Sequence, residues 1–517
     1  MTLITHGFNS DGSDWVNAMA DAVAKYPNLA LTNSTRYEIF FEQNSQGEYV
    51  PTQRKLAGVD PKSADSGEII VILDWSQLAG DLGGVDYSTT NVAPSVVSTL
   101  TSPTFIPELA GKPLIELPLH LIGHSRGGSL MCEIARMLGQ QGIWVDHLTT
   151  LDPHPLNNDY DDTILTDVVD GPAIPYVNVL FADNYYQINN SFLGLDPSGQ
   201  FEPGAYNRYL DVRSGGYGGI APYHSNTHLW YHGTIDWNTP ASDSAAMITA
   251  LERSSWWTAP ETNGTSAGFL YSLIGAGNRF SDATPAGGTN RIRNGFNQIW
   301  DFGAGSSSNR FALPDNSGLW PNLLTLNIAS TNLNPFEKNR QGYTITAGES
   351  LPLKLTFQYG QLQNTNLTLK IFLDPDFNPY STNETPLQTF PLQATGVGNV
   401  TTLNTAISGS QSAAPGIYAI GAAIADGIRV RYLYAPELLH LLPSVQPPEI
   451  GQPQINSGFI QADVHGAIGQ TIVVDTSLNL IDWTPIATNQ FSSSVWIFRD
   501  AFEPDAKLKA YRARLLQ

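Results

Sequence analysis

Cysteine is almost absent from this chain of 517 residues, because Cys132 is the only one. A single cysteine excludes an intramolecular disulfide and any metal centre built on several thiolates. Apolar runs of 18 or more residues are also missing, so the sequence predicts no transmembrane helix. No signal-peptide pattern is visible at the amino terminus.

Charge is scarce as well, and most of it has one sign. Lys, Arg, Asp and Glu make up 14% of the residues, well below the usual share, and the formal net charge is −21. This acidic balance argues against nucleic acid and anionic membranes as partners and favours an uncharged substrate, a small molecule or a lipid ester. Asn, Ser, Thr and Gly take the place of charges, a composition common among extracellular bacterial proteins. We therefore expect a secreted or cell-surface bacterial protein.

The length and the residue patterns of the chain predict three domains. Strand-like and helix-like runs alternate over residues 1–320, which predicts an α/β domain with a mostly parallel sheet. Short strands over residues 321–445, with a hairpin signal at Asp426-Gly427, predict a β-sandwich. A Pro-rich linker then leads to a small all-β module over residues 446–517. The expected strands of the first domain are Thr2–Thr5, Tyr37–Phe41, Ile69–Asp74, Pro118–Ile122, His147–Leu151 and Tyr176–Phe181.

The stretch "LIGHSRGGSLMCEIARML", residues 121–138, carries the spacing G-x-S-x-G at Gly123, Ser125 and Gly127. In a nucleophile elbow, the serine occupies a sharp turn between a buried strand and a helix. An apolar stretch precedes Gly123 and an amphipathic one follows Gly127, so the context fits an elbow. A second match, from Gly264 to Gly268, follows a stretch without strand character. We predict that Ser125 is a nucleophile, and the alternative is an ordinary tight turn.

A serine nucleophile also needs two N–H donors for the oxyanion that forms during attack. The residue after the serine supplies one of them, and here that residue is Arg126. The second donor comes from a loop after an earlier strand, and "HGFNSDGSDW" follows the first expected strand. Gly7 permits a close approach of the backbone, so the N–H of Phe8 is the second predicted donor.

Several residues compete for the remaining places in the order Ser, Asp, His. Asp152 and Asp183 each follow an expected strand, so the residues alone leave both open as the acid. In "YHSNTHLWYHGTIDW", Ser225 fits the N-cap of a helix, which leaves His224 on a loop and places His228 on the helix. Since a triad histidine normally lies on a loop, His224 is the first candidate for the base and His228 the second.

Four segments occur in the order found in α/β-hydrolase lipases: "HGF" (His6–Phe8), "ILDW" (Ile72–Trp75), "GHSRGG" (Gly123–Gly128) and "TTLDP" (Thr149–Pro153). The "LDP" resembles the pancreatic-lipase-like branch and the phospholipases A1 related to it. The resemblance implies an α/β-hydrolase fold and a bacterial lipase or esterase. It also implies that Asp152 is the triad acid, while the "HSN" that begins at His224 resembles the histidine segment of several bacterial lipases.

These expectations describe a serine hydrolase of carboxylic esters that works through Ser125, Asp152 and His224 and an acyl-enzyme. No metal and no cofactor are expected, because the sequence lacks H-E-x-x-H and any other complete ligand cluster. The Tyr- and Gly-rich insertion between Asp183 and His224 fits a cap or lid and equally a static loop. The alternatives are a phospholipase A1 and a secreted binding or adhesion protein with a degenerate hydrolase domain. The C-terminal β domains are candidates for attachment to a surface or polymer.

Overall fold

The structure is a computed structural model, and it describes most of the chain. The described residues are 1–516, except for 27–32, 159–165, 189–196, 211–214, 218–221, 237–247, 258–267, 275–309, 314–319, 338–339, 360–365, 394–399, 409–412, 444–446 and 505–507.

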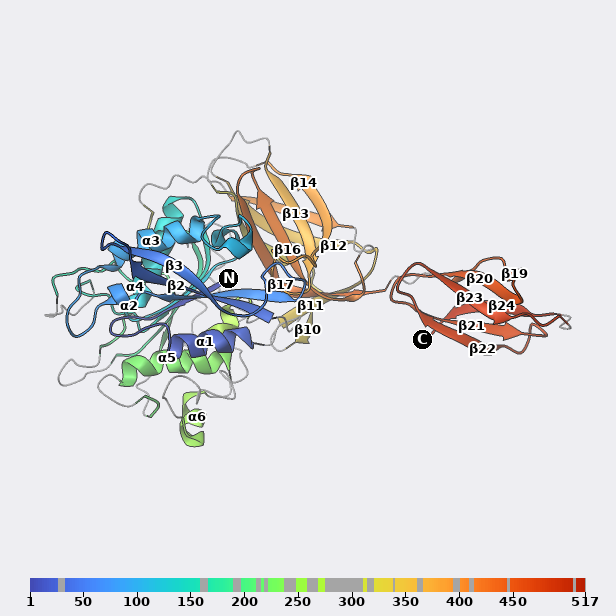
Figure 1. The fold of residues 1–517 in the computed structure, drawn as a ribbon, viewed down its shortest axis with the longest axis horizontal. Helices are drawn as coiled ribbons and strands as arrows, with labels where there is room; N and C mark the ends of the chain where they lie inside the picture. The colour runs from blue at the N-terminus through green and yellow to red at the C-terminus, as the bar shows by residue number, and fades with distance from the viewer. Residues whose placement is uncertain are drawn as a thin grey trace.

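An eight-stranded sheet forms the first part of the molecule (Figure 1). Its strands are β1 (Thr2–Thr5), β2 (Asn33–Gln43), β3 (Tyr49–Ala57), β4 (Ser66–Asp74), β5 (His120–His124), β6 (Val145–Leu151), β7 (Val179–Tyr186) and β8 (Tyr206–Tyr209). They lie in the order β3-β2-β4-β1-β5-β6-β7-β8, and each neighbouring pair is parallel except β2 and β3. The N-terminal part is therefore α/β with a mostly parallel sheet, which confirms this part of the fold prediction.

Helices cover both faces of this sheet. They are α1 (Trp15–Ala24), α2 (Ser76–Ala79), α3 (Thr89–Thr101), α4 (Arg126–Gln140), α5 (Pro222–Ile235) and α6 (Ala250–Trp256), with short 3-10 turns at Pro107–Leu109, Leu114–Glu116 and Gly268–Tyr271. Successive residues of the central strand β1 point to opposite faces. Leu3 packs in the core that contains α3 and α4, whereas Ile4 packs in the core that contains α1 and α5.

Two further sheets share a core over the next part of the chain. A six-stranded sheet has the order β10-β11-β17-β16-β13-β14, and a three-stranded sheet has the order β15-β12-β9. Their strands are β9 (Asn322–Ile328), β10 (Asn334–Glu337), β11 (Arg340–Thr346), β12 (Leu351–Gln358), β13 (Thr368–Asp374), β14 (Thr385–Pro391), β15 (Val400–Ile407), β16 (Gly416–Ala425) and β17 (Val430–Leu442). Leu355 of one sheet and Ile371 of the other belong to the same buried cluster, so the sheets pack face to face. The hairpin predicted at Asp426-Gly427 joins β16 to β17 and is confirmed.

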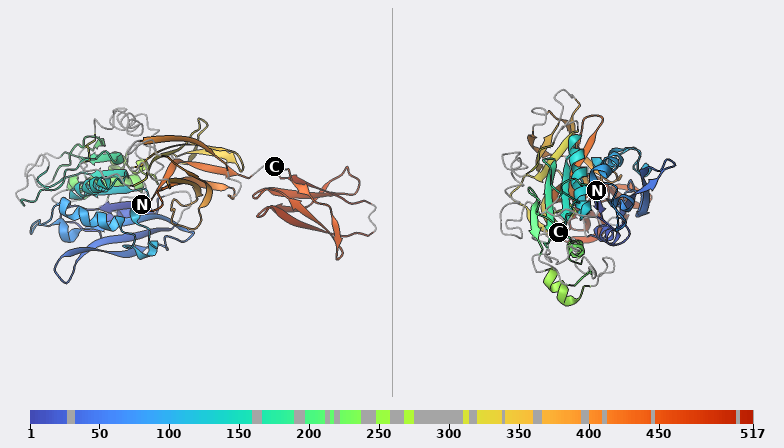
Figure 2. Two further views of the ribbon diagram at one scale, coloured as in Figure 1. Left: turned by 90° about the horizontal axis from the view of Figure 1, so that it is seen from above. Right: turned by 90° about the vertical axis from the view of Figure 1, so that its left-hand side faces the viewer.

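A smaller β module ends the chain and stands apart from the rest in two perpendicular views (Figures 1 and 2). Its strands are β18 (Glu449–Ile450), β19 (Gln454–Asn456), β20 (Phe459–His465), β21 (Thr471–Ser477), β22 (Thr484–Gln490), β23 (Val495–Ala501) and β24 (Ala510–Leu515). Val464, Ile472 and Phe498 belong to its own small core. Among the described residues, no helix is both long and apolar enough to cross a membrane.

The two face-to-face sheets dock on the amino ends of the strands of the first sheet. Arg431 of β17 donates to the carbonyl oxygens of Leu117 and Trp144 at 3.0 and 2.7 Å, and it pairs with Asp146 at 3.1 Å. Asn378 donates to the hydroxyl of Ser66, the first residue of β4, at 2.8 Å. The opposite edge of the sheet, formed by the carboxyl ends of the strands, is therefore not covered by these two sheets. The loops that carry the predicted site residues lie there.

Candidate active site

Ser125 stands at the sharp turn between β5 and α4. Its backbone has φ 57° and ψ −129°, a conformation that residues other than glycine rarely adopt. Glycines leave room for the turn, because a Cβ on Gly123 would lie 2.2 Å from the carbonyl oxygen of Gly127. Strain of about 1–3 kcal/mol per such residue persists only where the surroundings impose it, and such residues cluster at functional sites. Ser125 therefore has the strand–turn–helix context that the sequence predicted.

The loop after β1 passes directly against this serine. A Cβ on Gly7 would lie 2.6 Å from the Cβ of Ser125 and 3.0 Å from its Oγ, so only glycine lets the loop come this close. Phe8 follows on this loop, and Arg126 begins α4, where the first N–H groups have no acceptor within the helix. Of the two predicted oxyanion donors, one thus directly follows Ser125 in the chain and the other directly follows Gly7, which lies against Ser125.

The loop before Phe8 is held by polar contacts. His6 Nε2 lies 3.2 Å from Asp74 Oδ1, and the backbone N–H of Ser76 donates to the same oxygen at 2.9 Å. Burial raises the pKa of Asp74, but its hydrogen bonds with His6 and Ser76 outweigh this effect and lower the pKa to about 2. A hollow lined by Asp74, Phe41 and Gln77 opens at the same edge of the sheet.

Asp152 and His224 form a direct hydrogen bond. The distance from His224 Nδ1 to Asp152 Oδ2 is 2.6 Å, and Nδ1 must be the donor because a carboxylate can only accept. Asp152 is fully buried just after β6, next to the strand that leads to Ser125. It also accepts from the backbone and side-chain nitrogens of Gln187 at 2.8 and 2.9 Å and from the N–H of Gly199 at 3.1 Å. These donors compensate the buried negative charge and fix the orientation of the carboxylate.

The competing aspartate, Asp183, is engaged elsewhere. Its Oδ1 lies 2.8 Å from His147 Nε2 and accepts from the hydroxyl of Thr149 at 2.6 Å, while its Oδ2 accepts from Tyr185 at 2.8 Å. These partners lie within β6 and β7, in the interior of the sheet. The structure thus brings Asp152, and not Asp183, into contact with His224.

The prediction that His224 lies on a loop ahead of a helix capped by Ser225 is wrong. Helix α5 begins at Pro222, so His224 lies in its first turn. Proline is favoured at the first helical position, where its missing N–H costs nothing. The imidazole still reaches Asp152, because the helix starts at the edge of the sheet where the strands end.

Two further histidines, His124 and His228, lie close to His224. His124, the residue before Ser125, has its Nε2 3.0 Å from the carbonyl oxygen of His224, which links the elbow to α5. Burial lowers the pKa of His124 well below its ordinary value, and the neighbouring His224 and His228 lower it further. His228 stacks on Trp15, with ring centroids 4.0 Å apart and an angle of 22° between the planes.

Sequence reasoning missed the residues that hold Asp152, above all Gln187 and Gly199. One weak indication was available for Gln187, since it directly follows β7.

The cap or lid remains a prediction, because residues 189–196 lie outside the described part of the chain. The described parts of this insertion include β8, which extends the sheet, and Gly199. The second G-x-S-x-G match lies outside the described residues apart from Gly268.

Comparisons with known proteins give no family for this chain. No protein-family model matches, and no curated protein matches. Among solved structures, a β-glucosidase from Listeria innocua is similar with a TM-score of 0.16 and 12% identity, covering 25% of this chain and 17% of that one. The chicken CNTN1 FN1–FN3 domains give a TM-score of 0.13 and 8% identity, covering 38% of this chain and 60% of that one. A cytokine receptor complex gives a TM-score of 0.13 and 13% identity, covering 33% of this chain and 86% of that one. Likenesses this weak assign neither fold family nor activity, so the case for a function rests on the site itself.

Proposed function

We propose that this chain is a serine hydrolase that cleaves carboxylic esters, with an α/β-hydrolase fold in residues 1–320. The observation that carries the proposal is the 2.6 Å hydrogen bond between His224 and Asp152 at the edge of the sheet where the elbow serine stands. Ser125 follows β5, Asp152 follows the adjacent β6, and His224 comes later, in α5. The three residues therefore occur along the chain in the order Ser, Asp, His. Lipase, esterase and phospholipase A1 are all consistent with this arrangement.

In the proposed reaction, His224 Nε2 accepts the proton of Ser125 Oγ while this oxygen attacks the ester carbonyl carbon. Asp152 holds the imidazole in the required tautomer and stabilises its positive charge. The N–H groups of Phe8 and Arg126 stabilise the oxyanion, with about 3 kcal/mol for each donor. The intermediate collapses, and the alcohol leaves with the proton from His224. Water then gives a proton to His224 and attacks the acyl-serine, and His224 passes this proton to Ser125 Oγ as the acid leaves.

The proposal is tested with a fluorophosphonate probe and a series of p-nitrophenyl esters of increasing acyl length. We expect labelling and turnover by the intact chain, loss of both in Ser125→Ala, and retention of both in Ser98→Ala, which changes an exposed serine of α3. The chain-length profile separates esterase from lipase, and a phospholipid with a labelled sn-1 chain reports phospholipase A1 activity. An intact chain that neither reacts with the probe nor cleaves any ester would contradict the proposal and favour a binding protein.

We also propose that the protein is secreted or displayed on a bacterial surface and that its terminal module attaches it to an uncharged apolar surface. Large aliphatic side chains are exposed in this module, among them Ile455 (64%) of β19 and, in the loop between β21 and β22, Leu480 (58%) and Ile481 (80%). Phe459, just after the β19–β20 turn, pairs with Ala501, Lys509 forms an ion pair with Asp500 at 2.8 Å, and Ala510 pairs with Ser477, where the β21–β22 loop begins. Ile455 and the β21–β22 loop therefore lie at one end of the module. The net charge of −21 disfavours an anionic surface.

This attachment is tested by partition onto droplets of neutral lipid. A Leu480→Ser/Ile481→Ser double variant removes two aliphatic contacts of about 1.5–3 kcal/mol each when buried, so we expect at least about tenfold weaker partition. Ile428→Ser is the matched control, because Ile428 is 87% exposed in the β16–β17 hairpin, outside the module. Equal partition of the double variant and the intact chain would contradict the attachment.

A further inference from the structure

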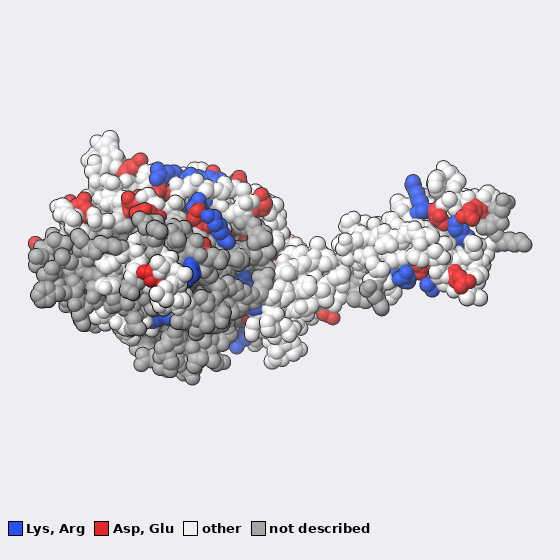
Figure 3. Space-filling model, turned by 90° about the horizontal axis from the view of Figure 1, so that it is seen from below, with Lys and Arg blue, Asp and Glu red and all other residues white. Residues whose placement is uncertain are grey.

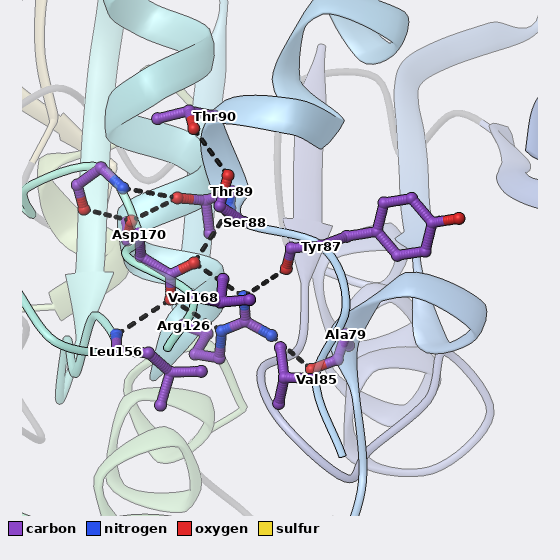
Figure 4. A network of polar contacts seen from close by, with 12 residues as sticks. Ala79, Val85, Tyr87, Ser88, Thr89, Thr90, Arg126, Leu156, Val168 and Asp170 are labelled. Atoms are coloured by element: carbon purple, nitrogen blue, oxygen red, sulfur yellow. Dashed lines mark hydrogen bonds and ion pairs between the residues drawn. The ribbon is translucent and has the colours of Figure 1, made fainter. Parts of the chain in front are cut away.

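The side chain of Arg126 is buried in a network that the proposed reaction does not use (Figure 4). Its Nε and one terminal nitrogen donate to the two oxygens of Asp170, each at 2.7 Å, which makes a bidentate ion pair. The guanidinium also donates to the carbonyl oxygens of Tyr87, at 2.9 Å, and Ala79. A buried guanidinium with this many partners has little freedom to move.

Asp170 joins this anchor to two further segments. The backbone N–H of Thr89, at the start of α3, donates to its Oδ1 at 2.9 Å, and the N–H of Leu156 donates to its Oδ2 at 2.9 Å. Both carboxylate oxygens are therefore shared between Arg126 and a backbone donor. The buried charges are paired and hydrogen-bonded, which is the condition under which such a pair is tolerated in a protein interior.

Trp75 links the same guanidinium to the loop on the other side of Ser125. The guanidinium carbon of Arg126 lies 5.1 Å from the centroid of the Trp75 ring, within the range of a cation–π contact. The indole N–H of Trp75 donates to the carbonyl oxygen of His6 at 2.8 Å. His6 precedes Gly7 and Phe8, so this bond holds the loop that carries one proposed oxyanion donor.

We infer that Asp170 and Trp75 are positioning residues that hold the N–H groups of Arg126 and Phe8 in place for the oxyanion. The inference rests on the proposed function. One network reaches both donors, since it binds the side chain of Arg126 and the carbonyl before Gly7. Oxyanion donors are effective only when they are fixed within hydrogen-bond distance of the place where charge develops. The unusual backbone of Ser125 also needs surroundings that resist relaxation, and an anchored Arg126 supplies them at the next residue.

Asp170→Asn is the first test, because it keeps the shape of the side chain and removes the charge that faces Arg126. We expect kcat on a soluble short-chain ester to fall at least about tenfold, with KM changed less than about twofold, as when a donor is lost from the transition state alone. The rate of labelling by the fluorophosphonate should fall in parallel, because the bound phosphonyl oxygen occupies the position of the oxyanion.

Asp146→Asn is the matched control, since it breaks a second buried Arg–Asp pair, Asp146 with Arg431, at the amino ends of the strands. We expect it to lower the thermal unfolding midpoint and to leave kcat within about twofold of the intact chain. An equal loss of kcat in Asp146→Asn and Asp170→Asn, or an unchanged kcat in Asp170→Asn, would overturn the inference.

Trp75→Phe keeps the inference testable if Asp170→Asn does not fold. This variant retains an aromatic ring beside Arg126 but removes the N–H that donates to His6, together with part of the ring volume, so we expect kcat to fall by about three- to tenfold with KM unchanged. A Trp75→Phe protein with full kcat would contradict the inference. Failure of the proposed function looks different, because the intact chain would then show no labelling and no turnover at all.

Discussion

His224 and His228 lie one turn apart on α5, but their side chains have different surroundings. His224 Nδ1 donates to a buried carboxylate that is itself held by Gln187. His228 instead packs flat on Trp15, and its ring centroid lies 4.7 Å from that of His124. An imidazole that must gain a proton and stay oriented needs the first environment, because a carboxylate fixes its tautomer and balances its charge.

We predict that His224→Gln lowers kcat by about a thousandfold or more, since it removes the base of the proposed triad. His228→Phe is expected to keep kcat within about threefold, because a phenyl ring can replace the imidazole in the stack on Trp15. Steady-state kinetics on one p-nitrophenyl ester, with the unfolding midpoint of each variant, checks both. A larger loss in His228→Phe than in His224→Gln would identify His228 as the base.

The sequence alone predicted those site residues that belong to a motif or that directly follow a strand. Ser125 stands in a G-x-S-x-G match, and Asp152 follows a buried strand. Gln187 reaches the same carboxylate from 35 residues further along the chain, and Asp170 pairs with a side chain 44 residues away. No local pattern announces such contacts, because they depend on how loops from different strands meet at one edge.

At the scale of elements, the buried strands were predictable and the edge strands were not. The expected strand Thr2–Thr5 is β1 without change, because a near-continuous apolar run is typical of a central parallel strand. β3 was missed, since "YVPTQRKLA" contains polar residues and a proline, and none of its residues is buried. β8 has four residues and stands at the other edge. The sequence did indicate where α5 begins, because proline is favoured at the first position of a helix. The helix begins at Pro222 and not after an N-cap at Ser225.

The packing of β5 against α4 leads to a prediction on Gly123. A Cβ there would lie 2.2 Å from a backbone oxygen of Gly127, so Gly123→Ala must displace the helix from the strand, and we expect a loss of about 3 kcal/mol of unfolding free energy. Gly416→Ala is the control, because its Cβ would meet only the ring of Tyr418, at 3.5 Å. Urea unfolding curves of both variants provide the measurement. Equal unfolding midpoints for the two variants would contradict this prediction, because the turn at Ser125 would then accommodate a Cβ at Gly123 without a loss of stability.

At the scale of the whole molecule, an acidic loop lies where the six-stranded sheet meets the first sheet. Asp376 is fully buried in this loop, and Asp374 is fully buried at the end of β13, just before it. The side chain of Asn378 donates to the carbonyl oxygen of Pro61 at 2.7 Å. Burial raises the pKa of Asp376 well above its ordinary value, and the neighbouring carboxylate of Asp374 raises it further. Asp376 is thus held neutral by its burial and by the adjacent carboxylate of Asp374.

This raised pKa predicts a fall in stability as the pH rises. The pKa of Asp376 is higher in the folded than in the unfolded chain, so its contribution is complete below about pH 4 and is lost as the pH rises through the folded-state pKa. We expect the thermal midpoint of Asp376→Asn to fall less between about pH 5 and pH 9 than that of the intact chain. Asp463→Asn, at an exposed site of the terminal module, should follow the intact chain. Identical pH profiles for all three proteins would contradict the prediction.

The division into an α/β part and later β parts was predictable, because residue patterns change along the chain. Their docking was not, since it depends on contacts such as the one between Arg431 and Asp146, which are 285 residues apart. A buried arginine in an alternating strand is indistinguishable by sequence from an exposed one.

The order of parts along the long axis of the molecule has a consequence for how the protein would meet its substrate. The strand ends that lead to Ser125 and Asp152 lie on the side of the first sheet opposite the two docked sheets, and the terminal module lies beyond those sheets (Figure 1). Figure 3 shows the module as a separate lobe that projects from the rest of the molecule. A protein tethered by the exposed loops of its module would therefore hold its reaction centre outward, toward the surrounding liquid. Such an immobilised catalyst would process molecules that arrive by diffusion and leave the material beneath its tether untouched.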